Sequence, residues 1–230
     1  MNTMTIGQHI RSYVLRQGRL STGQQRAIDE LFPQWGIQFT QDKGLLSLHE
    51  VFNREAPTIL EIGFGMGEPT INIAKTFPEK NFIAVDVHGP GIGNILKLID
   101  QENLTNVRII RHDAVEVLQF LIPPQSLAGV HIFFPDPWPK ARHHKRRLIQ
   151  SSFINNLVNY IQNGGYIHLA TDWQDYADQM LEVLSQCTQL KNTTSGFAVR
   201  PDYRPLTKFE NRGLKLGHGV WDLLFIKESK

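Results

Sequence analysis

The sequence predicts an α/β fold, a doubly wound and mostly parallel sheet of seven strands with an antiparallel hairpin at one edge. Three observations predict it. Short runs rich in Ile, Val and Phe alternate with segments of helical period from residue 58 onward. Gly, Pro or Asp stands at the joins between them. The last two apolar runs have no helical segment between them, which favours an antiparallel pair.

The apolar runs have the lengths that are usual for strands. The first five are expected to be parallel, because they alternate with helical segments, and the last two are expected to form the edge hairpin. The expected strands are residues 58–62, 81–87, 107–111, 129–134, 166–171, 194–199 and 219–226.

The segments between the strands are expected to be helices that pack on the sheet. In the fourth of them, apolar residues recur at i, i+3 and i+4 spacing from Leu148 to Ile161, which predicts a buried stripe. Residues 1–57 lack strand alternation and are interpreted as an N-terminal extension with a helix around 22–31, whereas residues 58–230 form the main domain. The helices expected in that domain are 68–76, 91–102, 114–121, 145–162 and 173–187.

The composition is that of an ordinary globular protein. The chain has 230 residues, 41% of them hydrophobic, with 18 Gly and 12 Pro, which excludes a disordered chain, a collagen and a coiled coil. The one cysteine, Cys187, cannot form a disulfide within the chain, and the first residues lack the apolar stretch of a signal peptide. Asn and Gln interrupt the uncharged run 148–171 too often for a membrane span. We therefore expect a cytoplasmic protein without a membrane partner.

The net charge of +2 is the sum of segments with opposite signs. Residues 61–139 carry 5 basic and 9 acidic side chains, whereas residues 140–230 carry 13 basic and 8 acidic ones. A solvated cationic loop explains one basic cluster as well as a binding site does, but two clusters favour a polyanionic partner such as a nucleic acid. The clusters are the run 140–147 and the series Arg200, Arg204, Lys208, Arg212 and Lys215.

A glycine-rich loop follows the first expected strand and precedes a helix, the setting in which a backbone approaches a bound nucleotide closely. It holds Gly63, Gly65 and Gly67, so its third glycine comes one position earlier than in the dinucleotide pattern G-x-G-x-x-G. Glu61 stands just before the loop and would repel a pyrophosphate, but it suits a cationic ligand such as S-adenosyl-L-methionine. The loop therefore favours S-adenosylmethionine over a nicotinamide dinucleotide.

Two further acids follow the next two expected strands. Asp86 comes 19 residues after Gly67, where a carboxylate can accept hydrogen bonds from both ribose hydroxyls of a nucleoside. Asp113 is placed to contact the adenine amino group, although it is equally suited to cap the helix that begins at Ala114.

A proline-rich loop follows the fourth expected strand. Three prolines in the five residues 135–139 exclude helix and strand there and make the loop rigid. Loops at the carboxyl ends of strands line the ligand crevice of such sheets, so Asp136 and Trp138 are expected to face the same crevice as the glycine loop. Asp136 is the strongest catalytic candidate, the alternative being a surface turn that its side chain stabilises.

Several stretches together resemble the bacterial tRNA (guanine-N7)-methyltransferase family. The most specific is Phe134-Pro-Asp-Pro-Trp-Pro-Lys140 with the basic run after it, whereas the glycine loop marks only the wider methyltransferase class. The resemblance implies a Rossmann-like class I methyltransferase fold and methyl transfer from S-adenosylmethionine to N7 of guanine 46 in the variable loop of tRNA, forming 7-methylguanosine. It runs from about Arg11 to Phe225 and includes Gly18-Arg19-Leu20, Gln24-Gln25-Arg26, Glu61 to Gly67, Thr171-Asp172-Trp173 and Thr207-Lys208-Phe209-Glu210.

The resemblance also implies roles for individual residues. Asp136 is expected to be catalytic and, together with Glu61, Asp86 and Asp113, to contact S-adenosylmethionine. Related sequences often carry Glu where this chain has Asp86. The residues expected to contact the guanosine are Lys140, Asp172, Thr207, Lys208, Phe209 and Glu210, and those expected to contact the tRNA are Arg142, His143, His144, Lys145, Arg146 and Arg147.

Local sequence leaves other interpretations of some residues open. Asp172 opens an expected helix, so capping explains it as well as substrate binding does. Trp138 and Trp173 suit packing better than stacking on a base. The carboxylate that accepts hydrogen bonds from the guanine edge is either Asp136 or Glu210. No metal is expected, because adjacent histidines in a basic run lack the spacing and the acidic partners of a zinc site.

Three other functions remain as alternatives. The stretch Asp136-Pro137-Trp138 resembles the D-P-P-W loop of exocyclic-amine nucleobase methyltransferases, although tryptophan replaces the second proline. A non-catalytic RNA-binding module is a second alternative, although it would not need the carboxylates that are expected to bind the cofactor. A nicotinamide dehydrogenase is a third, although it would carry the glycine spacing G-x-G-x-x-G. The sequence leaves the oligomeric state open between a monomer and a homodimer.

Overall fold

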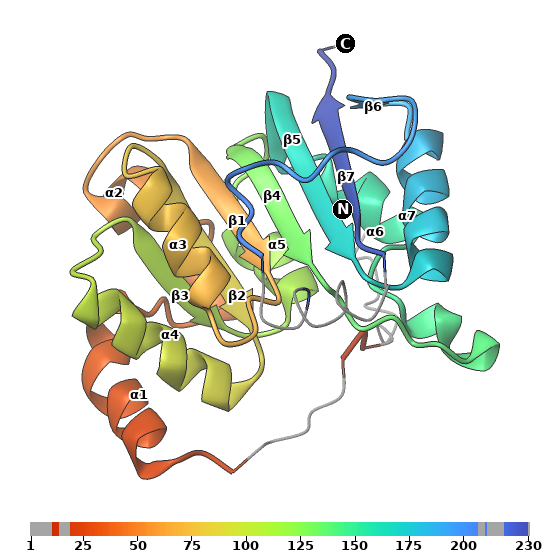
Figure 1. The fold of residues 1–230 in the computed structure, drawn as a ribbon. Helices are drawn as coiled ribbons and strands as arrows, with labels where there is room; N and C mark the ends of the chain where they lie inside the picture. Colours follow the sequence, from red (N-terminus) through yellow and green to blue (C-terminus); the bar gives the residue numbers. More distant parts are fainter. Residues whose placement is uncertain (1–10, 14–18, 207–209, 211–218, 230) are drawn as a thin grey trace.

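The computed structural model describes residues 11–13, 19–206, 210 and 219–229, and these contain a seven-stranded sheet in the order β3-β2-β1-β4-β5-β7-β6 (Figure 1). Strands β1 to β5 are parallel to one another, whereas β7 runs antiparallel to both β5 and β6. The predicted fold class is therefore confirmed. The strands are β1 Thr58–Ile62, β2 Asn81–Asp86, β3 Val107–Arg111, β4 Leu127–Phe133, β5 Ile161–Thr171, β6 Leu190–Asn192 and β7 Trp221–Lys227.

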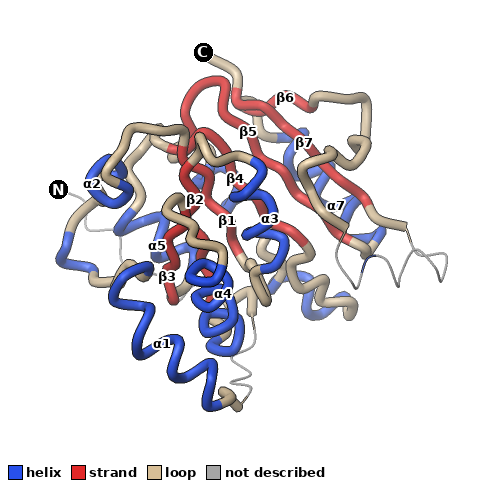
Figure 2. Tube along the Cα trace, turned by 60° about the vertical axis from the view of Figure 1, so that its left-hand side comes forward, coloured by secondary structure: helices blue, strands red, loops and turns tan. Residues whose placement is uncertain are grey.

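Helices cover both faces of the sheet, with α1, α3 and α4 on one face and α2, α5, α6 and α7 on the other (Figures 1 and 2). No helix in the described residues is long and apolar enough to cross a membrane. The helices are α1 Thr22–Trp35, α2 Leu48–Phe52, α3 Glu68–Thr76, α4 Gly89–Gln101, α5 Ala114–Leu121, α6 Ser151–Leu157 and α7 Gln174–Gln186, with 3₁₀ turns at η1 Gln41–Lys43 and η2 Ala141–Arg146.

The central strands are apolar at nearly every position because both of their faces are covered. Side chains alternate between the faces, so Ile59 and Phe82 pack under α3 and α4, whereas Leu60 and Ile83 pack under the helices of the other face. All four side chains are at most 1% exposed. Burial on both faces explains why these strands are continuous runs of Ile, Val and Phe in the sequence.

The described part of the extension before β1 packs closely on the rest of the chain. Its helix α1 begins at a capping box, in which Ser21 and Gln24 satisfy each other's backbone N–H groups. Helix α4 approaches α1 so closely that a Cβ on Gly93 would lie 2.6 Å from the backbone oxygen of Gln24. After α1 the chain follows the edge of the sheet, where the Ile37 N–H donates to the Ile109 carbonyl at 2.8 Å.

Both predicted bounds of the helix expected at 145–162 are wrong. Only Ser151–Leu157 is α-helical; Lys145 and Arg146, where the expected helix starts, belong to the 3₁₀ turn η2, and residues 147–150 are not helical. Its end joins the sheet instead, because Ile161 pairs with Leu127 at the beginning of β4. The buried apolar stripe is confirmed in α6, where Phe153, Ile154 and Leu157 are buried.

The strand expected at 194–199 is also wrong. The segment makes one isolated bridge, between Ala198 and Asp222, and the edge strand β6 lies earlier in the chain. Local hydrogen bonds compete with strand pairing there, since the Thr194 hydroxyl donates to the Gly196 carbonyl at 3.0 Å and Asn192 Nδ2 donates to the same carbonyl at 2.9 Å. Residues 193–206 therefore cross the face of the sheet as a loop (Figure 1).

Candidate active site

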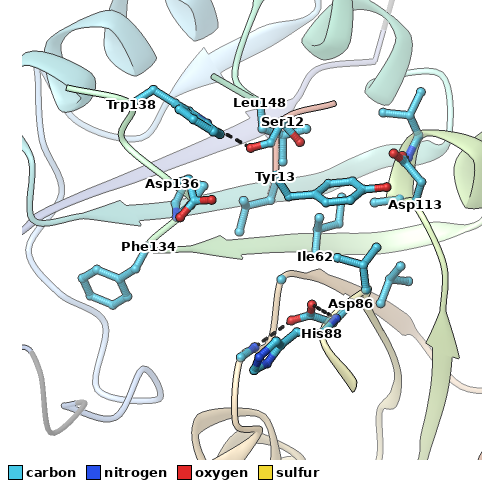
Figure 3. Close-up of a pocket in the computed structure, with 18 of the residues that line it drawn as sticks. Ser12, Tyr13, Ile62, Asp86, His88, Asp113, Phe134, Asp136, Trp138 and Leu148 are labelled. Carbon is cyan, nitrogen blue, oxygen red and sulfur yellow. Dashed lines mark hydrogen bonds between the residues drawn. The ribbon is translucent and has the colours of Figure 1, made fainter. Parts of the chain in front are cut away.

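A cavity of about 580 Å³ opens where the carboxyl ends of β1, β2 and β4 meet. The strand order reverses between β1 and β4, and ligands of open α/β sheets bind at such a reversal. Figure 3 shows Asp86, Asp113 and Asp136 around this space; Asp86 ends β2, and Asp113 and Asp136 follow β3 and β4. The lining also contains Ser12, Tyr13, Ile62, Gly63, Gly65, His88, His112, Phe134, Trp138 and Leu148.

The glycine loop presents bare backbone to the cavity. Gly63 and Gly65 have φ angles of +78° and +60°, which favour glycine, and no atom lies within 4 Å of where their Cβ atoms would be. Gly67 also has a positive φ, and a Cβ there would lie 2.6 Å from the side chain of Ile95. The first two glycines leave room for a ligand, and the third lets α3 and α4 pack.

Glu61 is a buried carboxylate beside this loop. It is 3% exposed, and its Oε2 atom has no hydrogen-bond partner among the described residues. Burial raises the pKa of Glu61 to about 7; a weaker effect of the Thr70 hydroxyl lowers it and the nearby Asp86 carboxylate raises it. A buried acceptor without a partner is costly unless a ligand supplies a donor, so Glu61 fits the cationic amino group of S-adenosylmethionine.

Asp86 lines the cavity and also holds the glycine loop. Its Oδ2 atom accepts from the Gly65 N–H at 3.0 Å, and its Oδ1 atom accepts from the His88 N–H at 2.9 Å. Burial raises the pKa of this carboxyl in spite of these bonds. Each carboxylate oxygen can accept a further hydrogen bond, so the shorter Asp side chain remains compatible with ribose hydroxyls.

Asp113 both caps a helix and lines the cavity. Its Oδ1 atom accepts from the Val115 N–H at 2.8 Å, which makes it the N-cap of α5. The Tyr13 ring lies in the same space with its hydroxyl toward Asp113 (Figure 3). Burial, assisted by Asp113, raises the pKa of Tyr13 to about 12. The two interpretations of Asp113 are therefore compatible with each other.

The proline-rich loop is strained as well as rigid. Phe134, just before it, and Trp138, within it, have φ angles of +52° and +45°, a region that bulky side chains rarely adopt. Asp136 is exposed and lines the cavity, as does Trp138. Trp138 is held by packing, since its Nε1 donates to the Ser12 carbonyl at 2.9 Å and Arg146 lies 4.8 Å from its ring centre. Asp136 and Trp138 thus share the cavity with the glycine loop, as expected.

The basic run after this loop forms the 3₁₀ turn η2. Lys140, Arg142 and Lys145 are exposed, and His143, His144 and Arg146 are half-buried. Desolvation and the neighbouring cations, Arg142 first among them, lower the pKa of His143. The run therefore presents a cationic surface beside the cavity, with lysine and arginine supplying its charge.

Arg147 differs from the other basic residues of the run and corrects the prediction that it contacts RNA. Its side chain is 1% exposed. It binds the Pro137 carbonyl, Gln179 and Asp175 within the protein. A guanidinium that is buried and bound in this way cannot also contact a phosphate in solution.

The residues expected to contact the guanosine are not all brought to the cavity. Thr207, Lys208 and Phe209 lie outside the described residues. Lys140 and Asp172 are exposed but do not line the cavity. Asp172 does not cap α7, because the N-cap position is Trp173, which is 41% exposed.

Glu210 is withdrawn into a buried cluster. Its carboxylate accepts two hydrogen bonds from Arg204, at 2.9 and 2.7 Å, and Arg204 also donates to Asp222 at 2.6 and 2.8 Å. The side chains of Arg204 and Glu210 are each 1% exposed. Of the two carboxylates considered for the guanine edge, Asp136 is the one that lines the cavity. Arg204 is likewise not available as part of a surface cluster.

Tyr13 and Ser12 line the cavity but carry no signal in the local sequence. They reach it through tertiary contacts between the start of the chain and the proline-rich loop. His88 and His112 follow β2 and β3, so their position at strand ends was a signal that could have identified them. In the described part of the chain, no group of three or more His, Cys, Asp or Glu side chains could hold a metal ion.

Comparisons with known proteins agree with this architecture. A family described as "Putative methyltransferase" matches residues 55–223. The chain is 58% identical over 220 residues to the tRNA (guanine-N(7)-)-methyltransferase of Nitrosospira multiformis, covering 96% of this chain and 95% of that protein. It is 59% identical over 216 residues to the protein of the same name from Chromobacterium violaceum, covering 94% of this chain and 95% of the relative.

Solved structures with the same fold are more distant in sequence. The 16S rRNA methyltransferase KamB has a TM-score of 0.59 and 13% identity over 81% of this chain and 96% of its own. The 30S ribosomal A1408 methyltransferase from an uncultured bacterium has a TM-score of 0.56 and 15% identity over 82% of this chain and 94% of its own. At this identity the likeness concerns the fold alone.

Proposed function

The chain belongs to the tRNA (guanine-N(7)-)-methyltransferase family, and we propose that it transfers the methyl group of S-adenosylmethionine to N7 of the variable-loop guanine of tRNA, at position 46. The observation that carries this proposal is the cavity itself. The glycine loop and the catalytic candidate Asp136 line it, Glu61 lies buried beside that loop with its Oε2 atom lacking a partner among the described residues, and a cationic surface lies next to it.

The cofactor residues we propose are those whose chemistry fits the parts of S-adenosylmethionine. Glu61 would accept from the amino group, Asp86 from the ribose hydroxyls and Asp113 from the adenine amino group, and Gly63, Gly65 and Gly67 would let the backbone approach. When bound, the cofactor supplies an electrophilic methyl group on a sulfonium sulfur.

The guanine needs positioning more than it needs proton transfer. N7 carries an in-plane lone pair and no proton, so the chain need not supply a general base for the attack. We propose that Asp136 accepts hydrogen bonds from the N1–H and N2–H edge of the base, which orients N7 and offsets the positive charge that develops on the ring. At an effective dielectric constant near 20, a carboxylate about 5 Å from that charge contributes roughly 3 kcal/mol.

The proposal is tested by identifying the product. Purified protein incubated with unmodified tRNA and S-adenosylmethionine should yield 7-methylguanosine, detected by nucleoside mass spectrometry and located at position 46 by mild reduction and aniline cleavage. An N6-methyl or N2-methyl product would support an exocyclic-amine methyltransferase instead. Binding of tRNA without any methylated product would support an RNA-binding module.

We propose that η2 and Lys140 form the tRNA-binding surface. If Lys140, Arg142, Lys145 and Arg146 each neutralise about one phosphate, the slope of log affinity against log salt should be roughly −2.8 to −3.6. Arg142→Ala should make the slope less negative by about 0.7–0.9. Lys191→Ala, which removes an exposed lysine on the edge strand β6, serves as the control and should leave the slope unchanged. A wild-type slope near zero would exclude a phosphate-binding surface.

Three properties follow as parts of the same proposal. The protein acts in the cytoplasm, where tRNA is the polyanionic partner. It works as a monomer or a homodimer. Residues 1–57 are an extension of the methyltransferase domain 58–230 that contributes Ser12 and Tyr13 to the cavity.

A further inference from the structure

Arg147 stands in the basic run but is turned into the protein. Its Nε donates to the Pro137 carbonyl at 2.9 Å, one terminal nitrogen donates to Gln179 Oε1 at 2.6 Å, and the other donates to Asp175 Oδ2 at 2.5 Å. The face of its guanidinium lies 4.8 Å from the ring centre of Tyr176. All three nitrogens are therefore engaged, and the side chain is 1% exposed.

The loop that Arg147 holds is poor in backbone hydrogen-bond donors. Pro135, Pro137 and Pro139 have no N–H to donate, so the loop cannot form backbone hydrogen bonds from those positions. The positive φ angles of Phe134 and Trp138 add backbone strain. Such a conformation persists only where the surrounding structure holds it, and the Arg147 contact to Pro137 lies next to Asp136.

On its other side, Arg147 is bound to helix α7. Asp175 and Gln179 lie four residues apart on α7 and so face the same side. Gln179 Nε2 also donates to the Ile149 carbonyl at 3.0 Å, and the buried Tyr176 hydroxyl accepts from the Ile149 N–H at 3.0 Å. The bond from Arg147 holds the pKa of Asp175 below its usual range. A lysine has one nitrogen in place of this planar fork and cannot reach all three acceptors.

On the basis of the proposed function, we propose that Arg147 is a positioning residue: it ties the Pro137 backbone to α7, and this holds Asp136 in place for methyl transfer to the guanine. It makes no contact with tRNA. Its role is thus different from that of Arg142, which lies five residues earlier in the same basic run and is exposed.

The kinetic test compares Arg147→Lys with Arg54→Lys. Arg54→Lys is a matched structural control, because Arg54 also donates to three acceptors, Asn81 Oδ1, Pro78 O and Lys80 O, but at the opposite end of β2 from the cavity. Each kcat is measured with saturating tRNA and cofactor and is divided by the fraction of protein that binds S-adenosylhomocysteine. Arg147→Lys should lower this kcat about tenfold to hundredfold and Arg54→Lys should not, since a small displacement of a catalytic group has effects of that size.

The salt dependence separates positioning from RNA contact. Arg147→Lys should keep the wild-type slope of log tRNA affinity against log salt, and so should Arg147→Gln, which removes the charge; Arg142→Ala should reduce it. If Arg147→Lys does not fold, the double variant Asp175→Ala and Gln179→Ala, which removes the outer anchors and keeps Arg147, should lower kcat at least about fivefold.

Several outcomes would overturn the inference while leaving the proposed function intact. These are a wild-type kcat in Arg147→Lys or in the double variant, equal losses in Arg147→Lys and Arg54→Lys, and a reduced salt slope in Arg147→Gln. If the wild-type protein forms no 7-methylguanosine, the proposed function itself fails.

Discussion

Replacing Asp136 with alanine is expected to lower kcat about a hundredfold while the protein stays folded. The Asp136 side chain is exposed at the cavity, so its removal costs little stability. The rate falls because the variant lacks a carboxylate worth roughly 3 kcal/mol when it lies about 5 Å from the charge that develops on the guanine ring. Steady-state assays with saturating tRNA and S-adenosylmethionine measure this kcat.

The conservative variant Asp136→Asn shows which property of the side chain matters. Asparagine keeps the size of the side chain but loses the charge, and its amide nitrogen cannot accept from the guanine edge. It should therefore resemble Asp136→Ala in kcat. Glu182→Gln, on the exposed side of α7, removes a carboxylate elsewhere and should leave kcat unchanged. Wild-type turnover in both Asp136 variants would falsify the role proposed for Asp136.

Replacing Glu61 with glutamine is expected to weaken S-adenosylmethionine binding about tenfold to hundredfold, because a charged hydrogen bond is worth about 1.5–3 kcal/mol. The carboxylate is buried and its Oε2 atom has no partner among the described residues, so no protein group replaces the lost charge. Isothermal titration calorimetry with S-adenosylmethionine measures the change. Glu79→Gln, at an exposed position, is the control. Wild-type affinity in Glu61→Gln would show that the amino group is bound elsewhere.

The same variant should make the protein more stable relative to wild type as the pH rises. The pKa of Glu61 is about 7 in the folded protein, above the 4.5 of a glutamate exposed to water, so the folded state holds a proton that the unfolded state has lost. The free energy of unfolding of the wild type therefore decreases through this pH range, and glutamine does not titrate. Urea denaturation at pH 5 and pH 8 should show the stability difference in favour of Glu61→Gln growing by about 2.5 kcal/mol. A difference that does not change with pH would mean that Glu61 ionises as an exposed glutamate does.

The pH dependence of cofactor binding follows from the same carboxylate. Glu61 must be ionised to pair with a cationic amino group, and with a pKa of about 7 it is mostly protonated below neutral pH. The cost of keeping this acid buried, with its Oε2 atom lacking a partner among the described residues, is then offset when the cofactor binds. Glu61 thus destabilises the protein without cofactor, but it supplies the negative charge that binds the cationic amino group.

Much of the fold could be predicted from local sequence because each central strand is buried on both faces. A strand covered on both sides must be apolar at consecutive positions, and the predicted strand 107–111 has the observed bounds of β3. Predictions were weakest where tertiary contacts replace a local pattern. Ile161 continues an apolar helical stripe in sequence, yet it pairs with Leu127 in the sheet, and Thr194 to Gly196 bond to one another instead of forming a strand.

The candidate site divides in the same way. Glu61, Asp86, Asp113 and Asp136 could be placed near one another from sequence, since each lies at or just after the carboxyl end of a strand, and these ends meet at one edge of the sheet. The burial of Glu61 and the missing partner of its Oε2 atom could not be predicted from sequence, because both depend on what packs over the side chain. The place of Tyr13 in the cavity could not be predicted from sequence either. It results from contacts between residues more than a hundred positions apart, such as Trp138 with Ser12.

The sequence by itself thus determined the fold class, the glycine loop, the carboxylates at the strand ends and the family. These depend on periodicity, on spacing and on residue type, all of which are local. Only the tertiary structure decided how the charges are used. Arg142 and Arg147 are indistinguishable in a basic run, and so are Asp136 and Glu210 as carboxylates. Packing exposes one member of each pair and buries the other against counter-charges, and burial decides whether a charge can meet a ligand or must hold the protein together.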